Sequence, residues 1–292
     1  MHCAIIGCGL AGLSTGYFLK NKGIKLTFFD KVGLGGGASK VASGLMHPYV
    51  GKKGLRSKFA TEALEVSQML IDQAEKALGE KVALRNGIFR HNWEGEFEDV
   101  KKINGGSLIQ SGITVFIDHY LQGLWKCLKS ELIIDEVSLT TDFSKYDRVI
   151  FALGGGFSNL ALDLPLQFVK GQILTVKSDK KWERSVIGSG HISPLRNGNY
   201  QIGSTYEHHF RDDKADIDIA KSYLEPKVKT FLPPLSTFEI IECKAGIRVA
   251  VKGSYIPLVK KINERMFIFT GLGSRGLLYH GLYGRHLANL IK

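Results

Sequence analysis

The first part of the chain has the hydrophobic pattern of a strand–helix–strand unit. Two short apolar runs, at residues 3–6 and 25–30, have the composition of strands buried on both faces of a parallel sheet. Between them, apolar residues recur at helical spacing from Leu10 to Phe18, and Gly23 ends the pattern. This order predicts a β–α–β unit at the start of the chain.

Similar signals return in the middle and at the end of the chain. Residues 58–78 and 119–132 have the spacing of amphipathic helices, and a buried strand at 149–153 runs into three glycines. Residues 266–291 repeat the order of strand, glycine turn and helix. Parallel strands with helices between them are therefore predicted at three places.

Period-two alternation fills the segments between these elements. Residues 81–92 are predicted to form a hairpin, and residues 164–242 alternate as antiparallel strands do. A helix at 216–232 lies within this region, and Pro226 is expected to break it.

These patterns predict an α/β fold in which two discontinuous domains share the chain. A Rossmann-like domain takes residues 1–80, 105–163 and 246–292, and an α+β domain with an antiparallel sheet takes residues 81–104 and 164–245. The first domain is expected to bind a dinucleotide and the second to bind the substrate.

Composition narrows the class of protein. The 292 residues are 44% hydrophobic and 23% charged, which is typical of a globular protein. No apolar run is long enough to span a membrane, and glycines interrupt the apolar N-terminus, so a cytoplasmic protein is expected. The four cysteines form no C-x-x-C pair, and no metal site is expected.

The charge balance is strongly basic. Lysine and arginine total 39 against 28 acidic residues, a net charge of +11. The basic residues cluster at Lys52, Lys53, Arg56 and Lys58, at Lys180, Lys181 and Arg184, and at Lys260 and Lys261. A solvated surface explains such clusters, and so does a polyanionic partner such as RNA.

The loop after the first strand carries the spacing G-x-G-x-x-G, at Gly7, Gly9 and Gly12. Asp30 ends the second strand at about the position, roughly 20 residues on, where the Rossmann fingerprint has an acidic residue for the ribose. The pyrophosphate of a dinucleotide is expected at the N-terminus of the helix, where N–H groups are free. The motif leaves open which dinucleotide binds.

Five stretches in order along the chain resemble the D-amino-acid oxidase family of FAD-dependent oxidoreductases: "AIIGCGLAGLSTGYFLKNKGIKLTFFD", "GGGAS", "RVIFALGGG", "GIR" and "GLGSRGL". Within this family the chain is most similar to the oxidase half of the bifunctional enzymes of tRNA 5-methylaminomethyl-2-thiouridine biosynthesis. "GASKVASGLMHP" and "HISPLRNGNYQIGSTYEHHFRDD" carry that second resemblance.

The resemblance implies an enzyme with non-covalently bound FAD that acts on the C–N bond of a secondary amine. Its substrate would be the N-substituted glycine of carboxymethylaminomethyl uridine in tRNA, converted to aminomethyl uridine with release of glyoxylate. Oxygen is the expected electron acceptor, and a separate methyltransferase is expected to act next. Three alternatives stay open: a glycine or D-amino-acid type oxidase of small molecules, a tRNA-binding flavoprotein without turnover, and a plain NAD-binding protein.

The resemblance also assigns residues to the cofactor and the substrate. Arg248 is expected to bind the substrate carboxylate, with His191 and Tyr206 beside it. Arg275 is expected to face the flavin, an RNA phosphate or a protein carboxylate. The positions assigned to FAD besides Gly7, Gly9, Gly12 and Asp30 are Leu10, Ala11, Lys31, Ala38, Ser39, Ser43, Gly44, Leu45, Met46, Val137, Ala152, Leu153, Gly154, Gly271, Gly273, Ser274, Arg275, Gly276 and Leu277.

Overall fold

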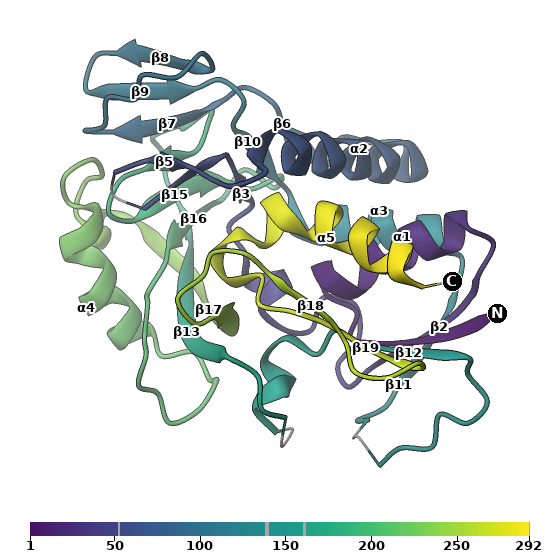
Figure 1. Ribbon diagram of the computed structural model, residues 1–292. Helices are drawn as coiled ribbons and strands as arrows, with labels where there is room; N and C mark the ends of the chain where they lie inside the picture. The colour runs from purple at the N-terminus through teal and green to yellow at the C-terminus, as the bar shows by residue number, and fades with distance from the viewer. Residues whose placement is uncertain (52, 138–139, 160–161, 292) are drawn as a thin grey trace.

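A computed structural model of the chain describes residues 1–51, 53–137, 140–159 and 162–291. Lys52, a member of one predicted basic cluster, lies outside these ranges. Two large sheets and a layer of helices make up the molecule (Figure 1). Two small sheets pair β3 (Leu45–Met46) and β6 (Ala83–Leu84) with β10 (Ile113–Val115), and β4 (Tyr49–Val50) with β5 (Leu55–Arg56).

The first large sheet has six strands, and all of them run parallel except the last. In spatial order they are β11 (Glu131–Ile134), β2 (Lys25–Asp30), β1 (His2–Ile6), β12 (Arg148–Phe151), β19 (Met266–Thr270) and β18 (Leu258–Lys261). Alternate side chains of its central strands enter two separate cores, one on each face. Burial on both faces explains the continuous apolar runs in the sequence.

Helices cover one face of this sheet. Figure 1 shows α1 (Leu10–Asn21), α3 (Ile117–Leu128) and α5 (Gly276–Leu290) over the strands, with α2 (Ala60–Leu78) packed on α3 and α5. Together with the parallel strands, they form the predicted Rossmann-like arrangement.

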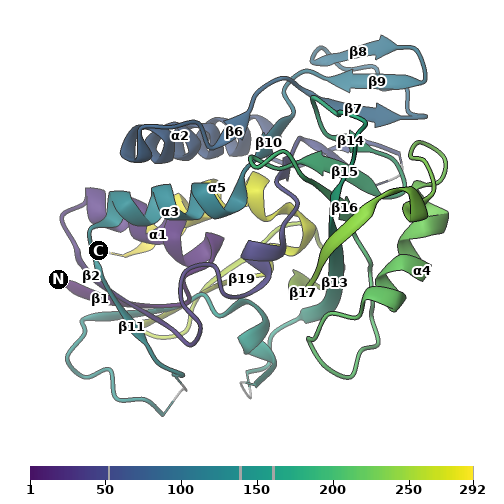
Figure 2. The same cartoon turned by 180° about the vertical axis from the view of Figure 1, so that it is seen from behind.

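The second large sheet has eight strands, which pair antiparallel except for β14 with β7. In spatial order they are β17 (Glu239–Val251), β13 (Leu166–Lys177), β16 (Tyr200–Gly203), β15 (His191–Pro194), β14 (Val186–Ile187), β7 (Ile88–His91), β9 (Gly106–Ile109) and β8 (Val100–Ile103). Helix α4 (Ile217–Val228) packs against β13 and encloses a third core (Figure 2). The α/β fold class predicted from the sequence is confirmed.

Helices α1 and α5 approach each other closely. A Cβ atom built on Gly284 would lie 2.6 Å from Ser14 Oγ and 2.9 Å from the Thr15 backbone nitrogen. The Ser14 hydroxyl donates a hydrogen bond of 2.8 Å to the His280 carbonyl across the same contact. Because both helices follow parallel strands, this contact holds their N-termini together at the carboxyl edge of the six-stranded sheet.

Two predictions about local structure were wrong. Residues 81–92 do not form a hairpin, because β6 pairs with β10 in one sheet while β7 pairs with β9 and β14 in another. Pro226 does not break α4, which ends two residues later at Val228. Pro226 lies in the last turn of α4, and only two helical residues follow it, so little of the helix remains for a proline to disrupt.

The division into two domains stays a prediction. Every strand of the six-stranded sheet comes from the segments assigned to the first domain. In the eight-stranded sheet, β9 and the end of β17 come from those segments as well. Among the described residues, no helix is long and apolar enough to cross a membrane, and no cluster of potential metal ligands occurs.

The α1–α5 contact predicts that a larger side chain at position 284 destabilises the fold. Gly284→Val should lower the free energy of unfolding by roughly 1–3 kcal/mol, because the added carbons overlap Ser14 and Thr15. Urea unfolding measures the change. Asn289→Ala, on the exposed side of α5, is the control and should shift stability by less than about 0.5 kcal/mol. Equal stability of the two variants would contradict the close contact.

Candidate functional site

A cavity of about 1040 Å³ lies between the two large sheets. Its walls come from the carboxyl edge of the six-stranded sheet, at Gly7, Ala152 and Gly271, and from the eight-stranded sheet, at Arg90 and His191. The carboxyl edge is where ligands bind in open parallel sheets. The volume is at the upper end of the range for small-molecule sites, which suits a long ligand.

The glycines of the N-terminal motif are required by the protein's own backbone. A Cβ atom on Gly7 would lie 2.3 Å from the Ala152 carbonyl oxygen, and one on Gly12 would lie 1.9 Å from the Gly7 carbonyl oxygen. Gly7 and Gly9 line the cavity, whereas Gly12 permits α1 to pack on the loop. Helix α1 has no acidic residue in its first turn, so its positive end remains suited to an anion.

Asp30 lies at the opposite side of this loop and lines the cavity. Its carboxylate accepts hydrogen bonds of 2.8–2.9 Å from the backbone nitrogens of Cys8, Val32 and Gly33. These bonds fix the carboxylate at the end of β2, beside the start of α1. This is the relative placement that a ribose and a pyrophosphate require.

Residues 38–45 form the wall between the two ends of the cavity. Ala38, Ser39, Ser43, Gly44 and Leu45, which the resemblance assigns to the cofactor, line it. Gly44 has a φ of +75°, and a Cβ atom there would lie 2.1 Å from the Val115 carbonyl oxygen. Contact with β10 therefore requires this glycine, whatever lies in the cavity.

The segments after β12 and β19 complete the dinucleotide end. Gly154 has a φ of +52°, lines the cavity, and has no heavy atom within 4 Å of a Cβ position. An open, glycine-rich path therefore continues past the carboxyl edge of the sheet. The other predicted residues on this path are Leu10, Ala11, Ala152, Leu153, Gly271, Gly273, Ser274, Arg275, Gly276 and Leu277. Together with the acid at one end and the helix N-terminus, this path fits FAD.

Four residues assigned to the cofactor lie off the lining. Gly12 packs on the loop, and Met46 is fully buried in the helix-side core. Val137 packs against the opposite core, and the Lys31 ammonium lies 3.6 Å from the Glu136 carboxylate at the surface. Their roles in cofactor binding stay predictions, as do those of the residues that line the cavity.

Arg248 lies on β17 at the substrate end of the cavity. Its guanidinium donates a hydrogen bond of 3.2 Å to the Thr205 carbonyl and lies 5.6 Å from the centre of the Tyr206 ring. A Cβ atom on Gly171 would lie 2.1 Å from Arg248 Nη2, so the neighbouring strand leaves space for the guanidinium. Burial lowers the pKa of Arg248 from its ordinary value.

His191 connects this end of the cavity to the 38–45 wall. Its Nε2 lies 2.6 Å from the Ser43 hydroxyl. Burial, with Arg248 and Lys227 nearby, lowers the pKa of His191 to about 3, so the imidazole is neutral at neutral pH. Arg248, His191 and Tyr206 line one cavity, as the sequence predicted.

Several lining residues were missed by the sequence analysis. Lys227 of α4 lines the substrate end, where its ammonium lies 4.1 Å from the centre of the Tyr223 ring. His47 and Arg90 also line the cavity, near Arg275. Neither Lys227 nor Arg90 belongs to a motif, and only the pairing of distant strands and the docking of α4 bring them to the cavity.

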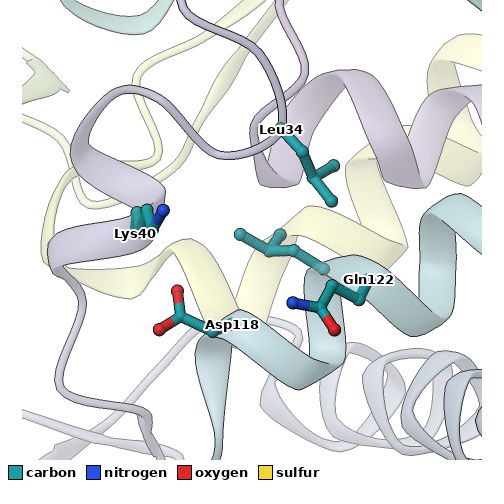
Figure 3. A pocket seen from close by; sticks show the side chains of 5 residues that line it. Leu34, Lys40, Asp118 and Gln122 are labelled. Atoms are coloured by element: carbon teal, nitrogen blue, oxygen red, sulfur yellow. The ribbon is translucent and has the colours of Figure 1, made fainter.

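A smaller, shallow pocket of about 280 Å³ lies outside this cavity, between the loop after β2 and helix α3. Figure 3 shows Lys40 on one side and Asp118 and Gln122 on the other. None of the predicted site residues lines this pocket. The large cavity is therefore the candidate site.

The neutral histidines predict how stability depends on pH. His47 and His191 each have a pKa lowered to about 3 by burial and by nearby cations, from 6.5. The unfolded chain binds their protons below pH 6.5 and the folded chain does not, so their contribution to stability is lost as pH falls. Between neutral pH and about pH 5, the free energy of unfolding of His191→Gln should therefore fall by roughly 2 kcal/mol less than that of the wild type.

Urea unfolding at several pH values tests this expectation. His209→Gln is the control because His209 is exposed, and it should follow the wild type. A His191→Gln protein whose stability falls as steeply with acid as that of the wild type would contradict the assignment of a buried neutral imidazole.

Comparison with known proteins agrees with this geometry. Residues 2–107 and 104–290 match the DAO family, described as FAD dependent oxidoreductase. The chain is 23% identical over 374 residues to the tRNA 5-methylaminomethyl-2-thiouridine biosynthesis bifunctional protein MnmC of Saccharophagus degradans, covering 98% of this chain and 52% of that protein. It is 30% identical over 153 residues to glycine oxidase of Pseudomonas aeruginosa, covering 50% of this chain and 42% of that protein. The chain thus spans about half the length of the bifunctional relatives it matches.

Solved structures share the fold over nearly the whole chain. Glycine oxidase from Geobacillus kaustophilus has a TM-score of 0.82 at 18% identity, covering 99% of this chain and 94% of that one. Iminodiacetate oxidase from Chelativorans has a TM-score of 0.80 at 19% identity, covering 99% and 95%. The family match, the fold and the fit of the cavity confirm the resemblance seen in the sequence: the chain belongs to the DAO family of FAD-dependent oxidoreductases, and FAD is its cofactor.

Proposed function

We propose that the protein oxidises the N-substituted glycine of carboxymethylaminomethyl uridine in tRNA, releasing glyoxylate and leaving aminomethyl uridine. The observation that carries this proposal is Arg248, which stands at the substrate end of a cavity whose other end fits FAD. Relatives that cover 98% of the chain are bifunctional proteins of tRNA 5-methylaminomethyl-2-thiouridine biosynthesis, which supports a tRNA substrate.

Arg248 binds and orients the substrate carboxylate. Its planar fork can donate two parallel hydrogen bonds to a carboxylate, a geometry that a lysine cannot reproduce. The Thr205 carbonyl accepts a hydrogen bond from the guanidinium, and Gly171, which has no side chain, leaves room for it. Ser43 and His191, which contact each other, line the same cavity.

The charges at this end of the cavity favour an uncharged amine. Arg248 is a cation, Lys227 has a pKa lowered by burial and by Arg248, and His191 near both of them is neutral. Nearby positive charge and burial disfavour a protonated amine, so the substrate nitrogen is held with its lone pair available. When bound, FAD supplies the two-electron acceptor for oxidation of the C–N bond, after which water hydrolyses the substrate imine to glyoxylate and the shortened amine.

The net charge of +11 supports a polyanionic substrate. An enzyme of free amino acids has no need for such an excess, whereas one that acts on tRNA must bind phosphates. The proposal includes a cytoplasmic location, oxygen as the final electron acceptor, and a separate methyltransferase that acts on the product.

The second candidate is an oxidase of small amino acids, because Arg248 and FAD would serve that reaction equally well. The likeness of the fold to glycine oxidase and iminodiacetate oxidase is compatible with it. A third candidate is a tRNA-binding flavoprotein without turnover, which requires tRNA binding that is unchanged in Arg248→Ala and no release of glyoxylate.

The glycine loop predicts a variant that loses FAD. Gly9→Glu places a carboxylate at the N-terminus of α1, where even a Cβ atom on residue 9 would lie only 2.7 Å from Ser39 Oγ. Both the volume and the charge of that side chain oppose a pyrophosphate, so the FAD bound per protein should fall about tenfold or more. The ratio of flavin to protein absorbance measures this.

Gln122→Glu adds the same carboxylate at an exposed position on α3 and should retain a full complement of FAD. If Gly9→Glu is purified with as much FAD as this control, the loop does not hold the pyrophosphate.

The proposed role of Arg248 can be tested by assaying tRNA oxidation with the wild type and an Arg248 variant. The wild-type holoprotein, mixed without oxygen with tRNA that carries carboxymethylaminomethyl uridine, should lose its flavin absorbance and release glyoxylate. Arg248→Lys retains the charge without the fork, and its kcat/KM should fall about 10²–10⁴-fold while FAD is retained. Arg211→Lys, at an exposed arginine, should match the wild type.

The same assay includes glycine, N-methylglycine and D-alanine as substrates. Rapid bleaching of the flavin by a free amino acid at low concentration, with no reaction of the tRNA, would establish the small-molecule oxidase instead. Unimpaired turnover of tRNA by Arg248→Lys would remove Arg248 from the site.

A further inference from the structure

Further basic side chains line the cavity besides those around Arg248. This second basic cluster consists of the cations Arg90 and Arg275, with the neutral His47 beside them. Arg90 is 8% exposed, its guanidinium lies 4.6 Å from the centre of the Trp93 ring, and it donates a hydrogen bond to the Gly51 carbonyl. Arg275 donates a hydrogen bond of 2.7 Å to the Ser57 hydroxyl.

Arg275 is incompletely satisfied by the protein. Its Nε is buried and has no hydrogen-bond partner, and the guanidinium forms no ion pair among the residues that the structure describes. Burial, with a smaller contribution from Arg90, lowers the pKa of Arg275 to about 10, and the same two arginines help to keep His47 neutral. Burial also lowers the pKa of Arg90, so a bound anion would stabilise the charge of both arginines.

The cavity wall offers little negative charge to balance these cations. Asp30 is the only carboxylate among the described lining residues, and it lies at the dinucleotide end with its oxygens bonded to backbone nitrogens. The pyrophosphate of FAD belongs at that same end, beside Gly7 and Gly9. Neither group therefore accounts for Arg90, and Arg275, which the resemblance expects to face the flavin, an RNA phosphate or a protein carboxylate, lies near Arg90.

The strand register relates the second basic cluster to His191, whose imidazole lies near Arg248. Arg90 on β7 pairs with Ile187 on β14, and Ile187 pairs with His191 on β15. Arg90 and His191 thus occupy one row across the sheet, two strand spacings or about 10 Å apart at the backbone. Residues of one row project from the same face, and both line the cavity.

We propose that the cavity binds two anionic groups of one substrate: the glycine carboxylate at Arg248, and a phosphate next to the modified nucleoside at Arg90 and Arg275. This inference rests on the proposed function and specifies how an RNA substrate is distinguished from a free amino acid. It makes Arg90 and Arg275 determinants of specificity that act on a part of the substrate distant from the reacting carbon.

The separation favours a phosphate over a second carboxylate. In iminodiacetate the two carboxyl carbons are joined through four bonds, a span of at most about 5 Å. In a nucleotide that carries the carboxymethylaminomethyl group, the linker, the base and the ribose separate the carboxylate from the phosphate by a distance on the order of 10 Å. The row from Arg90 to His191, which lies near Arg248, is about twice the first span at the backbone and comparable with the second.

The test measures binding without turnover. The ligands are analogues of carboxymethylaminomethyl uridine in which an ether oxygen replaces the amine nitrogen, prepared as the nucleoside and as its 3′,5′-bisphosphate. Equilibrium dialysis against the holoprotein gives both dissociation constants. The bisphosphate should bind about 10–100-fold more tightly than the nucleoside, because a phosphate gains charge-assisted hydrogen bonds at the second basic cluster.

Arg90→Gln should reduce this ratio toward one, and Arg90→Lys, which retains the charge, should retain part of it. Lys101→Gln removes one charge from an exposed position on β8 of the same sheet and should keep the wild-type ratio. The flavin spectrum of each variant verifies that the protein is folded and loaded with FAD.

Equal affinity for the two analogues in the wild type would overturn the proposal, and so would an unchanged ratio in Arg90→Gln. A preference for iminodiacetate over N-methylglycine that depends on Arg90, without any preference for the bisphosphate, would assign the cluster to a second carboxylate and also overturn it. Because the analogues cannot be oxidised, these outcomes are independent of whether tRNA is oxidised, which is the test of the proposed function.

Discussion

The close packing of α1 against α5 is the constraint on which the site depends. Gly284 lets the two helices approach, and Ser14 bonds to the His280 carbonyl across the contact. Each helix begins at the carboxyl edge of the six-stranded sheet, so residues from the two ends of the chain line one cavity. The N-terminal glycine loop supplies the anion-binding end, and the C-terminal turn supplies Arg275.

Charge at the substrate end determines what the cavity can bind. Among the described residues, three arginines and a lysine line the cavity: Arg90, Arg248, Arg275 and Lys227. Two histidines among them are kept neutral by burial and by these same basic side chains, so the histidines add no charge at neutral pH. With one carboxylate among the described lining residues, at the far end, such a cavity selects anions and disfavours protonated amines. That selection is what oxidation of an N-substituted glycine attached to a polyanion requires.

The sequence predicted the parts of the site that depend on contiguous residues, namely the glycine loop, Asp30, and the segments around Arg248 and "GLGSRGL". It did not predict Arg90 or Lys227, because their positions depend on β7 pairing with β14 and on the docking of α4. The same limit explains the false hairpin at 81–92: alternation indicates strands but does not choose their partners.

The most direct test of the account is an analysis of modified nucleosides in tRNA from cells that lack this protein. The account predicts that carboxymethylaminomethyl uridine accumulates, that the wild-type gene removes it, and that Arg248→Lys does not. Unchanged tRNA nucleosides in those cells, together with accumulation of a free amino acid, would contradict the assignment of the cavity to a tRNA substrate.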